Sequence, residues 1–361
     1  MKIEELKLCV LFGGESSEHE VSGRSAVYII ELLRSQSANA LYQIGISKQG
    51  EFFLFEGPLE EIYDGTWVDN PNNQPVLFKP GRHSGFYSCT SDDQAPIWHP
   101  VDVFLPILHG KRGEDGTIQG LLDMVHARYV GCKVLSSAVS MDKVVSQQLF
   151  DHAGIPQATW TWLTDTGYRQ DKLAALERIE GQLSYPIFVK PANAGSSVGI
   201  SKVTTRSELC AALELAFIHD HKAVLEETIV GREIELAVLE DPSLESGVFV
   251  SKPGEIVPDK EFYDYESKYI SESARLLVPA QVTDREYADL VAYATKAFKI
   301  VNGSGLSRVD FFIEQPSGRI LINEINTMPG FTSISMYPKL MTSSGYSAQD
   351  LIKSLIHSAL K

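Results

Sequence analysis

The most constraining feature of the chain is a pair of expected β-strands, SRVDFFIEQPSGRILINEIN, joined by the turn sequence QPSG. Arg308 and Asp310 are two residues apart, so one strand directs both side chains to the same face. Glu324 and Asn326 do the same on the second strand. The turn residues fold one strand back onto the other as a hairpin. Three oxygen-bearing side chains and one guanidinium are therefore predicted to converge on one face of a sheet whose other positions are largely apolar.

These residue types suit the binding of a metal ion and of phosphate. Oxygens of Asp, Glu and Asn are ligands that Mg²⁺ prefers, and a guanidinium stabilises an anion that develops charge during a reaction. The alternative is that alternating charges mark only the solvated face of an antiparallel sheet. The functional interpretation is favoured because residues 327–333, TMPGFTS, follow directly and offer backbone donors and hydroxyls. The pattern indicates the metal and phosphate end of a nucleotide-dependent enzyme.

Length and composition limit the class of protein. A chain of 361 residues is long enough for two or three domains. The net charge of −15 argues against a general binder of nucleic acid or of anionic membranes. The four cysteines are scattered without metal-site spacing, which is typical of reduced, buried thiols. Because the chain shows no apolar signal segment and no stretch of membrane-spanning length, we expect a cytoplasmic protein.

The first part of the chain has the order of elements expected for an open α/β sheet. A strand is predicted at 6–12, a helix at 21–33 and a second strand at 41–47. Residues 56–100 are rich in Pro, Gly, Asn, Asp and Ser and are expected to form an irregular insertion. The sheet is expected to resume at 101–108.

Elements of an α+β module are predicted beyond Gly131. The expected elements are a helix at 141–152, strands at 186–190 and 223–227, and a helix that begins at the capping box Thr283-Asp284-Arg285-Glu286 and stops at Gly303.

Several further segments carry candidate binding groups. The loop KPANAGSSVG begins at Lys190 after an apolar strand, and its small residues allow close approach of backbone amides to phosphate. The alternative for it is a flexible surface loop. It is not a Walker A loop, since no G-x-x-x-x-G-K-[ST] occurs, and no complete G-x-G-x-x-G occurs either.

Charged residues near other strand and helix ends have both functional and ordinary explanations. Glu226, Glu227 and Glu233 can bond an adenine amino group or ribose hydroxyls, although single carboxylates are more often solvated. Lys143, near the start of its helix, is interpreted on its own as a surface lysine. Glu18, in GGESSEHE after the first strand, can pair with a substrate ammonium group or can cap the following helix.

The run FYDYESKY, residues 262–269, combines three tyrosines with three charged residues and shows no clear period. We expect a mobile loop that closes over a site, with scattered surface tyrosines as the alternative.

Together these segments resemble the D-alanine–D-alanine ligases of the ATP-grasp superfamily. The resemblance is carried, in chain order, by GGESSEHEVS, HGKRGEDGTIQG, SMDK, FVKPANAGSSVG, GREIE, YDYESKY, SRVDFF and NEINTMPGFTSISMYPKL. It implies an ATP-grasp fold of α/β and α+β type, in which an N-terminal Rossmann-like open sheet accompanies two α+β modules that clasp ATP. The implied domains are 1–131, 132–226 and 227–361.

The resemblance also implies roles for individual residues. For ATP they are Lys143 and Lys190 on the phosphates, Glu226 and Glu233 on adenine and ribose, backbone at Glu227 and Ile229 along the base, Phe262 packed on it, and Lys268 reaching phosphate when the loop closes. For metal they are Asp310, Glu324 and Asn326, holding two Mg²⁺ ions that Mn²⁺ can replace. For the substrates they are Glu18 on the first D-alanine with Ser196 and Tyr269, His109 nearby, Arg308 and the Gly330 amide at the oxyanion, and Ser335 and Met336 at the second D-alanine.

The activity implied is ligation of two D-alanines through a D-alanyl phosphate, for synthesis of a peptidoglycan precursor, by a homodimer. Intact Lys268 and Tyr269 favour D-alanine as second substrate over D-lactate, and ligation to D-serine is a further alternative. Two more distant interpretations are a non-catalytic nucleotide-binding protein on the same fold and a dinucleotide-dependent oxidoreductase. The former is expected to have lost one of the ligand residues, and the latter lacks its glycine spacing.

Overall fold

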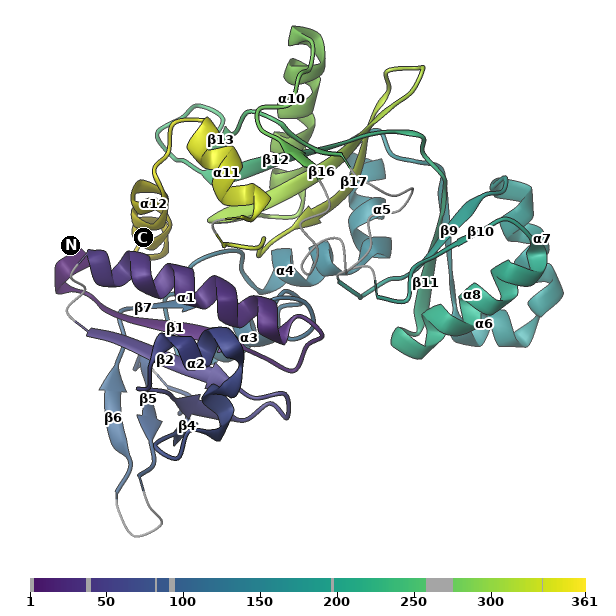
Figure 1. The fold of residues 1–361 in the computed structure, drawn as a ribbon. Helices are drawn as coiled ribbons and strands as arrows, with labels where there is room; N and C mark the ends of the chain where they lie inside the picture. Colours follow the sequence, from purple (N-terminus) through teal and green to yellow (C-terminus); the bar gives the residue numbers. More distant parts are fainter. Residues whose placement is uncertain are drawn as a thin grey trace.

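The computed structural model describes residues 3–36, 40–81, 83–90, 95–195, 198–257, 275–332 and 334–361. It contains three β-sheets, two of which pack side by side while the third projects away from them (Figure 1). The predicted roles of Ser196, Phe262, Lys268 and Tyr269 concern residues outside the described part of the chain. Among the described residues, no helix has both the length and the apolar character needed to cross a membrane.

The N-terminal sheet has seven strands in the order β6-β5-β4-β3-β2-β1-β7. Strand β1 lies parallel to both β2 and β7, as expected for an open α/β sheet. Its glycines have φ values of +87° at Gly13 and +102° at Gly14, and this left-handed turn brings the chain into helix α1. The strands are β1 Lys7–Gly13, β2 Ala40–Ile46, β3 Phe52–Leu54, β4 Gln74–Leu77, β5 Gly85–Ser88, β6 Ile97–Pro100 and β7 Val103–Pro106; the accompanying helices are η1 Ile3–Glu5, α1 His19–Ser35, α2 Leu59–Asp64, η2 Thr66–Asp69 and α3 Thr117–Met124.

The expectation of an irregular insertion at 56–100 was wrong. Strands β4, β5 and β6 extend the sheet through antiparallel pairing. Each has only four residues, and the turn residues between them dominate the composition, so the period of two is too short to be recognised.

The central sheet has four antiparallel strands in the order β10-β9-β11-β8 and is covered by helices (Figure 1). It encloses a hydrophobic core of its own. The predicted strands at 186–190 and 223–227 are confirmed as β9 and β11. The elements are β8 Trp160–Thr164, α6 Asp165–Gln170, α7 Lys172–Gln182, β9 Ile187–Pro191, β10 Ser201–Val203, α8 Arg206–His219 and β11 Lys222–Glu227.

The C-terminal sheet has six strands in the order β15-β14-β12-β16-β17, with β13 paired to β12. The predicted hairpin is confirmed as β16 and β17, and the capping box at Thr283 is confirmed at the start of α10. The elements are β12 Gly231–Glu240, β13 Val248–Val250, β14 Gly254–Val257, β15 Arg275–Leu277, α10 Asp284–Ile300, β16 Leu306–Glu314, β17 Ile320–Asn326, α11 Met336–Ser343 and α12 Ala348–Ala359.

The two faces of this sheet have different partners. Val309, Phe311 and Ile325 pack in one core with helix α10. On the opposite face, Ala237 and Leu239 share a continuous core with residues of β1 and α1 from the N-terminal sheet. The N-terminal and C-terminal sheets are thus joined by shared hydrophobic packing, whereas the central sheet has a separate core.

Two short helices, α4 Val134–Met141 and α5 Lys143–Ala153, connect the N-terminal sheet to the central one. The single helix expected at 141–152 is therefore interrupted at its start. Asp142 ends α4 and caps α5, because its side chain accepts the backbone N–H groups of Val144 and Val145. This break places Lys143 in the first turn of α5.

Candidate active site

A row of three carboxylates crosses the C-terminal sheet. Asp310 of β16 lies opposite Glu235 of β12 on one side and opposite Glu324 of β17 on the other. Arg308 and Asn326 form the next row on the same face. The convergence predicted from the hairpin is confirmed, and Glu235 is an additional member. Adjacent like charges destabilise a sheet unless cations compensate them, so this arrangement favours cation binding.

Arg308 is the principal counter-charge of the row. Its guanidinium donates two hydrogen bonds to Asp310, at 2.7 and 2.6 Å, and lies 3.1 Å from a Glu235 oxygen. Burial alone would lower the pKa of Arg308, but Asp310 and Glu235 raise it well above its ordinary value. The guanidinium therefore stays charged. The Asn326 amide also donates to Asp310, at 3.0 Å.

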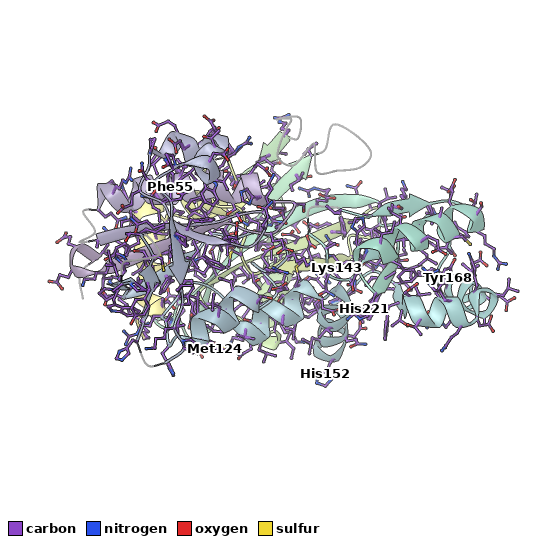
Figure 2. All side chains as sticks on the ribbon, turned by 90° about the horizontal axis from the view of Figure 1, so that it is seen from below. Phe55, Met124, Lys143, His152, Tyr168 and His221 are labelled. Carbon is purple, nitrogen blue, oxygen red and sulfur yellow. The ribbon has the colours of Figure 1, made fainter. Side chains whose placement is uncertain are left out.

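Lys143 connects this row to the central sheet. Its ammonium donates to the Ala194 carbonyl at 2.9 Å and lies 3.8 Å from a Glu324 oxygen. Figure 2 shows Lys143 near the middle of the molecule, between Phe55 of the N-terminal sheet region at the left and Tyr168 of α6 at the right. The interpretation of Lys143 as an ordinary surface lysine is not supported, because only 15% of its side chain is exposed.

The loop that follows β9 is held at both ends by the C-terminal end of α8. Asn193 donates two hydrogen bonds to Asp220, one from its backbone at 2.7 Å and one from its side chain at 2.8 Å. At the other end, a Cβ atom on Gly199 would lie 2.5 Å from His219, so only glycine allows this approach. These contacts fix the two ends of the predicted phosphate-binding loop.

Lys190, near the end of β9, pairs with Glu226. Its ammonium lies 2.5 Å from one Glu226 oxygen, and Gln147 of α5 donates to the other. Burial alone would lower the pKa of Lys190, but Glu226 raises it, and the charges of Glu324 and Glu233 add to this effect. The charge of Glu324, in the carboxylate row, thus acts on Lys190 at the end of β9. We call the loop after β9, residues 192–199, the central loop, and it shares this electrostatic environment with the row.

Glu18 lies where three segments of chain meet. It is buried at the start of α1, and a Cβ atom on Gly110 or Gly195 would lie 2.5 or 2.7 Å from its Oε2 atom. The Glu18 carboxylate therefore lies against the backbone of both glycines. The residue is the N-cap of α1, yet its side chain accepts no capping hydrogen bond, so capping does not explain it.

His109 joins the N-terminal sheet to the segment after β17. Its Nδ1 atom donates to the Met328 carbonyl at 3.0 Å, and Nε2 faces the Ser25 hydroxyl at 3.3 Å. Burial lowers the pKa of His109, although Glu18 opposes this shift. A neutral imidazole fits both contacts.

Glu114 is a second carboxyl group near Glu18. One of its oxygens accepts the Gly110 backbone N–H at 2.9 Å. Its side chain is half-buried, and the surrounding protein disfavours the charged form. This desolvation and the charge of Glu18 raise the pKa of Glu114 from 4.5 to about 8.

The raised pKa of Glu114 makes the stability of the folded protein depend on pH. The pKa is higher in the folded than in the unfolded state, so the folded state holds more protons between 4.5 and about 8. The contribution of Glu114 to the free energy of unfolding is complete below its pKa in the unfolded state. It is lost as pH rises through its pKa in the folded state. We predict that urea unfolding of the ligand-free protein, from about pH 5 to pH 8, shows a decline in the free energy of unfolding that Glu114→Gln reduces. The amide can still accept the Gly110 N–H, so parallel curves would contradict the assignment.

The segment after β17 contains the remaining predicted substrate residues. A Cβ atom on Gly330 would lie 3.0 Å from the Ser335 hydroxyl, which also bonds Thr332. Ser335 precedes the first turn of α11. The Met336 side chain is buried and packs against Gly254, so only its backbone is available to a ligand.

Glu227 lies on β11, Glu233 lies on β12 and Ile229 lies in the connection between these strands. All three residues are half-buried. The residues that the sequence did not single out are Glu114, Gln147 and Glu235. For Glu235 a signal existed, because it follows Glu233 by two residues in GREIE and therefore lies on the same face of β12. Glu114 lies within HGKRGEDGTIQG, a segment that carries the resemblance, but no role was assigned to it. Gln147 carried no signal.

Comparison with known proteins agrees with this geometry. The family described as D-ala D-ala ligase N-terminus matches residues 7–132, and the family described as D-ala D-ala ligase C-terminus matches residues 149–357. The chain belongs to the D-alanine–D-alanine ligase family. Curated D-alanine–D-alanine ligases from Acetivibrio thermocellus and Caldicellulosiruptor bescii are 42% and 43% identical, and each comparison covers 99% of this chain and 96% of the relative.

Solved structures of ligases share the fold. A D-Ala:D-Ser ligase from Enterococcus faecalis, VanG, superposes with a TM-score of 0.86 at 38% identity, covering 98% of this chain and 99% of the other. The D-alanine–D-alanine ligase from Coxiella burnetii superposes with a TM-score of 0.84 at 32% identity, covering 99% and 94%. The expected ATP-grasp fold is confirmed.

Proposed function

We propose that the protein joins two D-alanine molecules to D-alanyl-D-alanine and converts one ATP to ADP and phosphate. The observation that carries the proposal is the meeting of Asp310, Glu324, Asn326 and Arg308 on β16 and β17, in a chain that matches both parts of the ligase family. We also infer three domains, 1–131, 132–226 and 227–361, with ATP held between the second and third. A cytoplasmic homodimer that supplies a peptidoglycan precursor completes the proposal.

ATP would lie between the central loop and the carboxylate row. Lys143 and Lys190 would contact its phosphates, since both ammonium groups lie within this shared environment. Glu226 would accept the adenine amino group and Glu233 a ribose hydroxyl. Backbone at Glu227 and Ile229 would line the base, with Phe262 packed on it.

The residues present fit a hard divalent cation. Asp310, Glu324 and Asn326 supply oxygen donors on neighbouring strands, and the carboxylates of the row lie beside the cationic groups of Arg308 and Lys143. Among the described residues, no three His, Cys, Asp or Glu side chains are already in metal-binding arrangement, and Asp310 accepts hydrogen bonds from Arg308 and Asn326. Two Mg²⁺ or Mn²⁺ ions held there would neutralise phosphate charge.

In the first step, the carboxylate of the first D-alanine attacks the γ-phosphorus of ATP. The bond between the γ-phosphorus and the bridging oxygen breaks, ADP leaves and D-alanyl phosphate forms. Phosphoryl transfer is needed because a carboxylate offers only oxide as a leaving group. Glu18 would hold the ammonium of this D-alanine, together with Ser196 and Tyr269, and His109 would lie nearby.

In the second step, the nitrogen of the second D-alanine attacks the acyl carbon after its ammonium has lost one proton. The carbonyl oxygen becomes negative, and Arg308 with the Gly330 amide would stabilise it. The tetrahedral species collapses, the bond from carbon to the phosphate oxygen breaks, and phosphate leaves. Ser335 and the Met336 backbone would receive the second D-alanine, and Lys268 would contact phosphate.

D-serine is a second candidate for the amine substrate, because the D-Ala:D-Ser ligase VanG shares the fold at a TM-score of 0.86. D-alanine is favoured over D-lactate by Lys268 and Tyr269. Competition of D-alanine with D-serine or D-lactate, with products separated by mass, distinguishes these substrates.

Loss of Tyr269 should uncouple ATP use from ligation, because an acyl phosphate exposed to water hydrolyses. We predict that Tyr269→Ala releases more phosphate than dipeptide. Tyr63→Ala, which alters an exposed tyrosine on α2, serves as the control and should keep the two equal. Full coupling in Tyr269→Ala would contradict the role in water exclusion.

The acyl phosphate can be tested with D-alanine labelled with ¹⁸O in its carboxylate. One labelled oxygen should pass into phosphate for each dipeptide formed, because that oxygen stays on phosphorus when the C–O bond breaks. Phosphate without label would exclude this route.

A further inference from the structure

Gln147, on α5, contacts the residue proposed to read the base. Its Nε2 atom lies 2.5 Å from Glu226 Oε1, across 79 residues of sequence. Lys190 bonds the other oxygen of the same carboxylate. Gln147 and Glu226 are 5% and 6% exposed, so this contact lies almost wholly within the protein.

The orientation of the Gln147 amide is set by the carboxylate. Its NH₂ group must face Glu226, because an amide oxygen there would be repelled by the negative charge. The amide oxygen itself has no hydrogen-bond partner among the residues that the structure describes. The only side-chain hydrogen bond that this amide makes in the described structure is therefore the one to Glu226.

A buried carboxylate needs partners that remain in place when a ligand binds. Lys190 is proposed to contact the phosphates of ATP, so its charge is then divided between phosphate and Glu226. A carboxylate left unpaired in the interior is costly. Gln147 approaches the carboxylate from α5, whereas Lys190 approaches it from β9.

We propose that Gln147 is a positioning residue that holds the Glu226 carboxylate in the orientation that accepts the exocyclic amino group of the adenine base. This inference rests on the proposed function. Gln147 fixes Oε1 by donation, and Oε2 keeps a lone pair for the base in addition to its bond with Lys190. The site then prefers a 6-aminopurine nucleotide through the pair of residues rather than through Glu226 alone.

The test compares ATP with purine riboside triphosphate, which lacks the 6-amino group, in steady-state ligation. Gln147→Leu should raise KM for ATP about tenfold, the effect of losing one hydrogen bond to a charged group, with kcat little changed. KM for purine riboside triphosphate should stay at the wild-type value. Gln147→Met, which keeps the length of the side chain without a donor, should give the same pattern if Gln147→Leu does not fold.

Gln148→Leu is the matched control, because Gln148 is the neighbouring residue on the exposed side of the same helix. It should leave both KM values unchanged. An unchanged KM for ATP in the Gln147 variants, or an equal rise for both nucleotides, would overturn the inference and leave the proposed function intact. Failure of the wild-type protein to ligate D-alanine with ATP would instead overturn the proposed function.

Discussion

Replacement of Glu324 by alanine is expected to abolish ATP-dependent ligation. Glu324 is one of three carboxylates in the row across β12, β16 and β17, and it is the one that faces Lys143. Its loss removes a proposed metal ligand and a counter-charge of a proposed phosphate-binding lysine. The effect should appear as loss of phosphate release at all Mg²⁺ concentrations, while Glu324→Asp should retain activity with a higher requirement for Mg²⁺.

Glu314→Gln is a suitable control for this experiment. Glu314 belongs to the same hairpin but pairs with Arg319 near its turn, away from the carboxylate row. This variant should keep wild-type activity. Near-normal turnover of Glu324→Ala would contradict the proposed role of Glu324 in metal binding.

Replacement of Arg308 by alanine is expected to lower kcat by about 10²–10³-fold, the usual effect of losing an oxyanion donor. The structure adds a second consequence. Asp310 and Glu235 both lose the guanidinium that faces them at 2.6 and 3.1 Å, so their mutual repulsion is no longer balanced. The variant should therefore also have a lower melting temperature, which differential scanning calorimetry would measure.

Two further variants separate these effects. Arg308→Lys keeps a positive charge but not the paired geometry, so it should recover stability more fully than kcat. Arg319→Ala removes an arginine of the same hairpin whose side chain is 55% exposed, and kcat should not change. An Arg308→Ala variant with nearly normal kcat would contradict the oxyanion assignment.

Patterns among residues close together in the sequence explain which parts of the site were predictable. The hairpin of β16 and β17 was predicted because residues two apart share a face of a strand, and the observed register places Arg308 opposite Asn326 and Asp310 opposite Glu324. The start of α10 was predicted because a capping box is contained within four residues. Such features depend only on neighbours along the chain.

The features that were missed depend on contacts between distant segments. The raised pKa of Glu114 arises from its surroundings and from Glu18, which lies on a different element. Gln147 acquires its partner only when α5 packs against β11. Strands β4 to β6 were missed for another reason, since four residues are too few to reveal a period among turn residues.

The central sheet packs independently of the other two sheets, and the proposed nucleotide-binding residues lie where it meets the C-terminal sheet. Its core is separate from the core that joins the N-terminal and C-terminal sheets. Lys143 contacts the central loop at Ala194 and the C-terminal sheet at Glu324, so it lies where the two parts meet. Nucleotide bound at this junction would be held by side chains from both.

The most direct test of the proposed ligase activity is to measure phosphate release from ATP by the purified protein with Mg²⁺ and D-alanine, and to identify the product by mass spectrometry. We expect one D-alanyl-D-alanine for each phosphate released, with no turnover when L-alanine replaces D-alanine. Absence of the dipeptide under these conditions would contradict it.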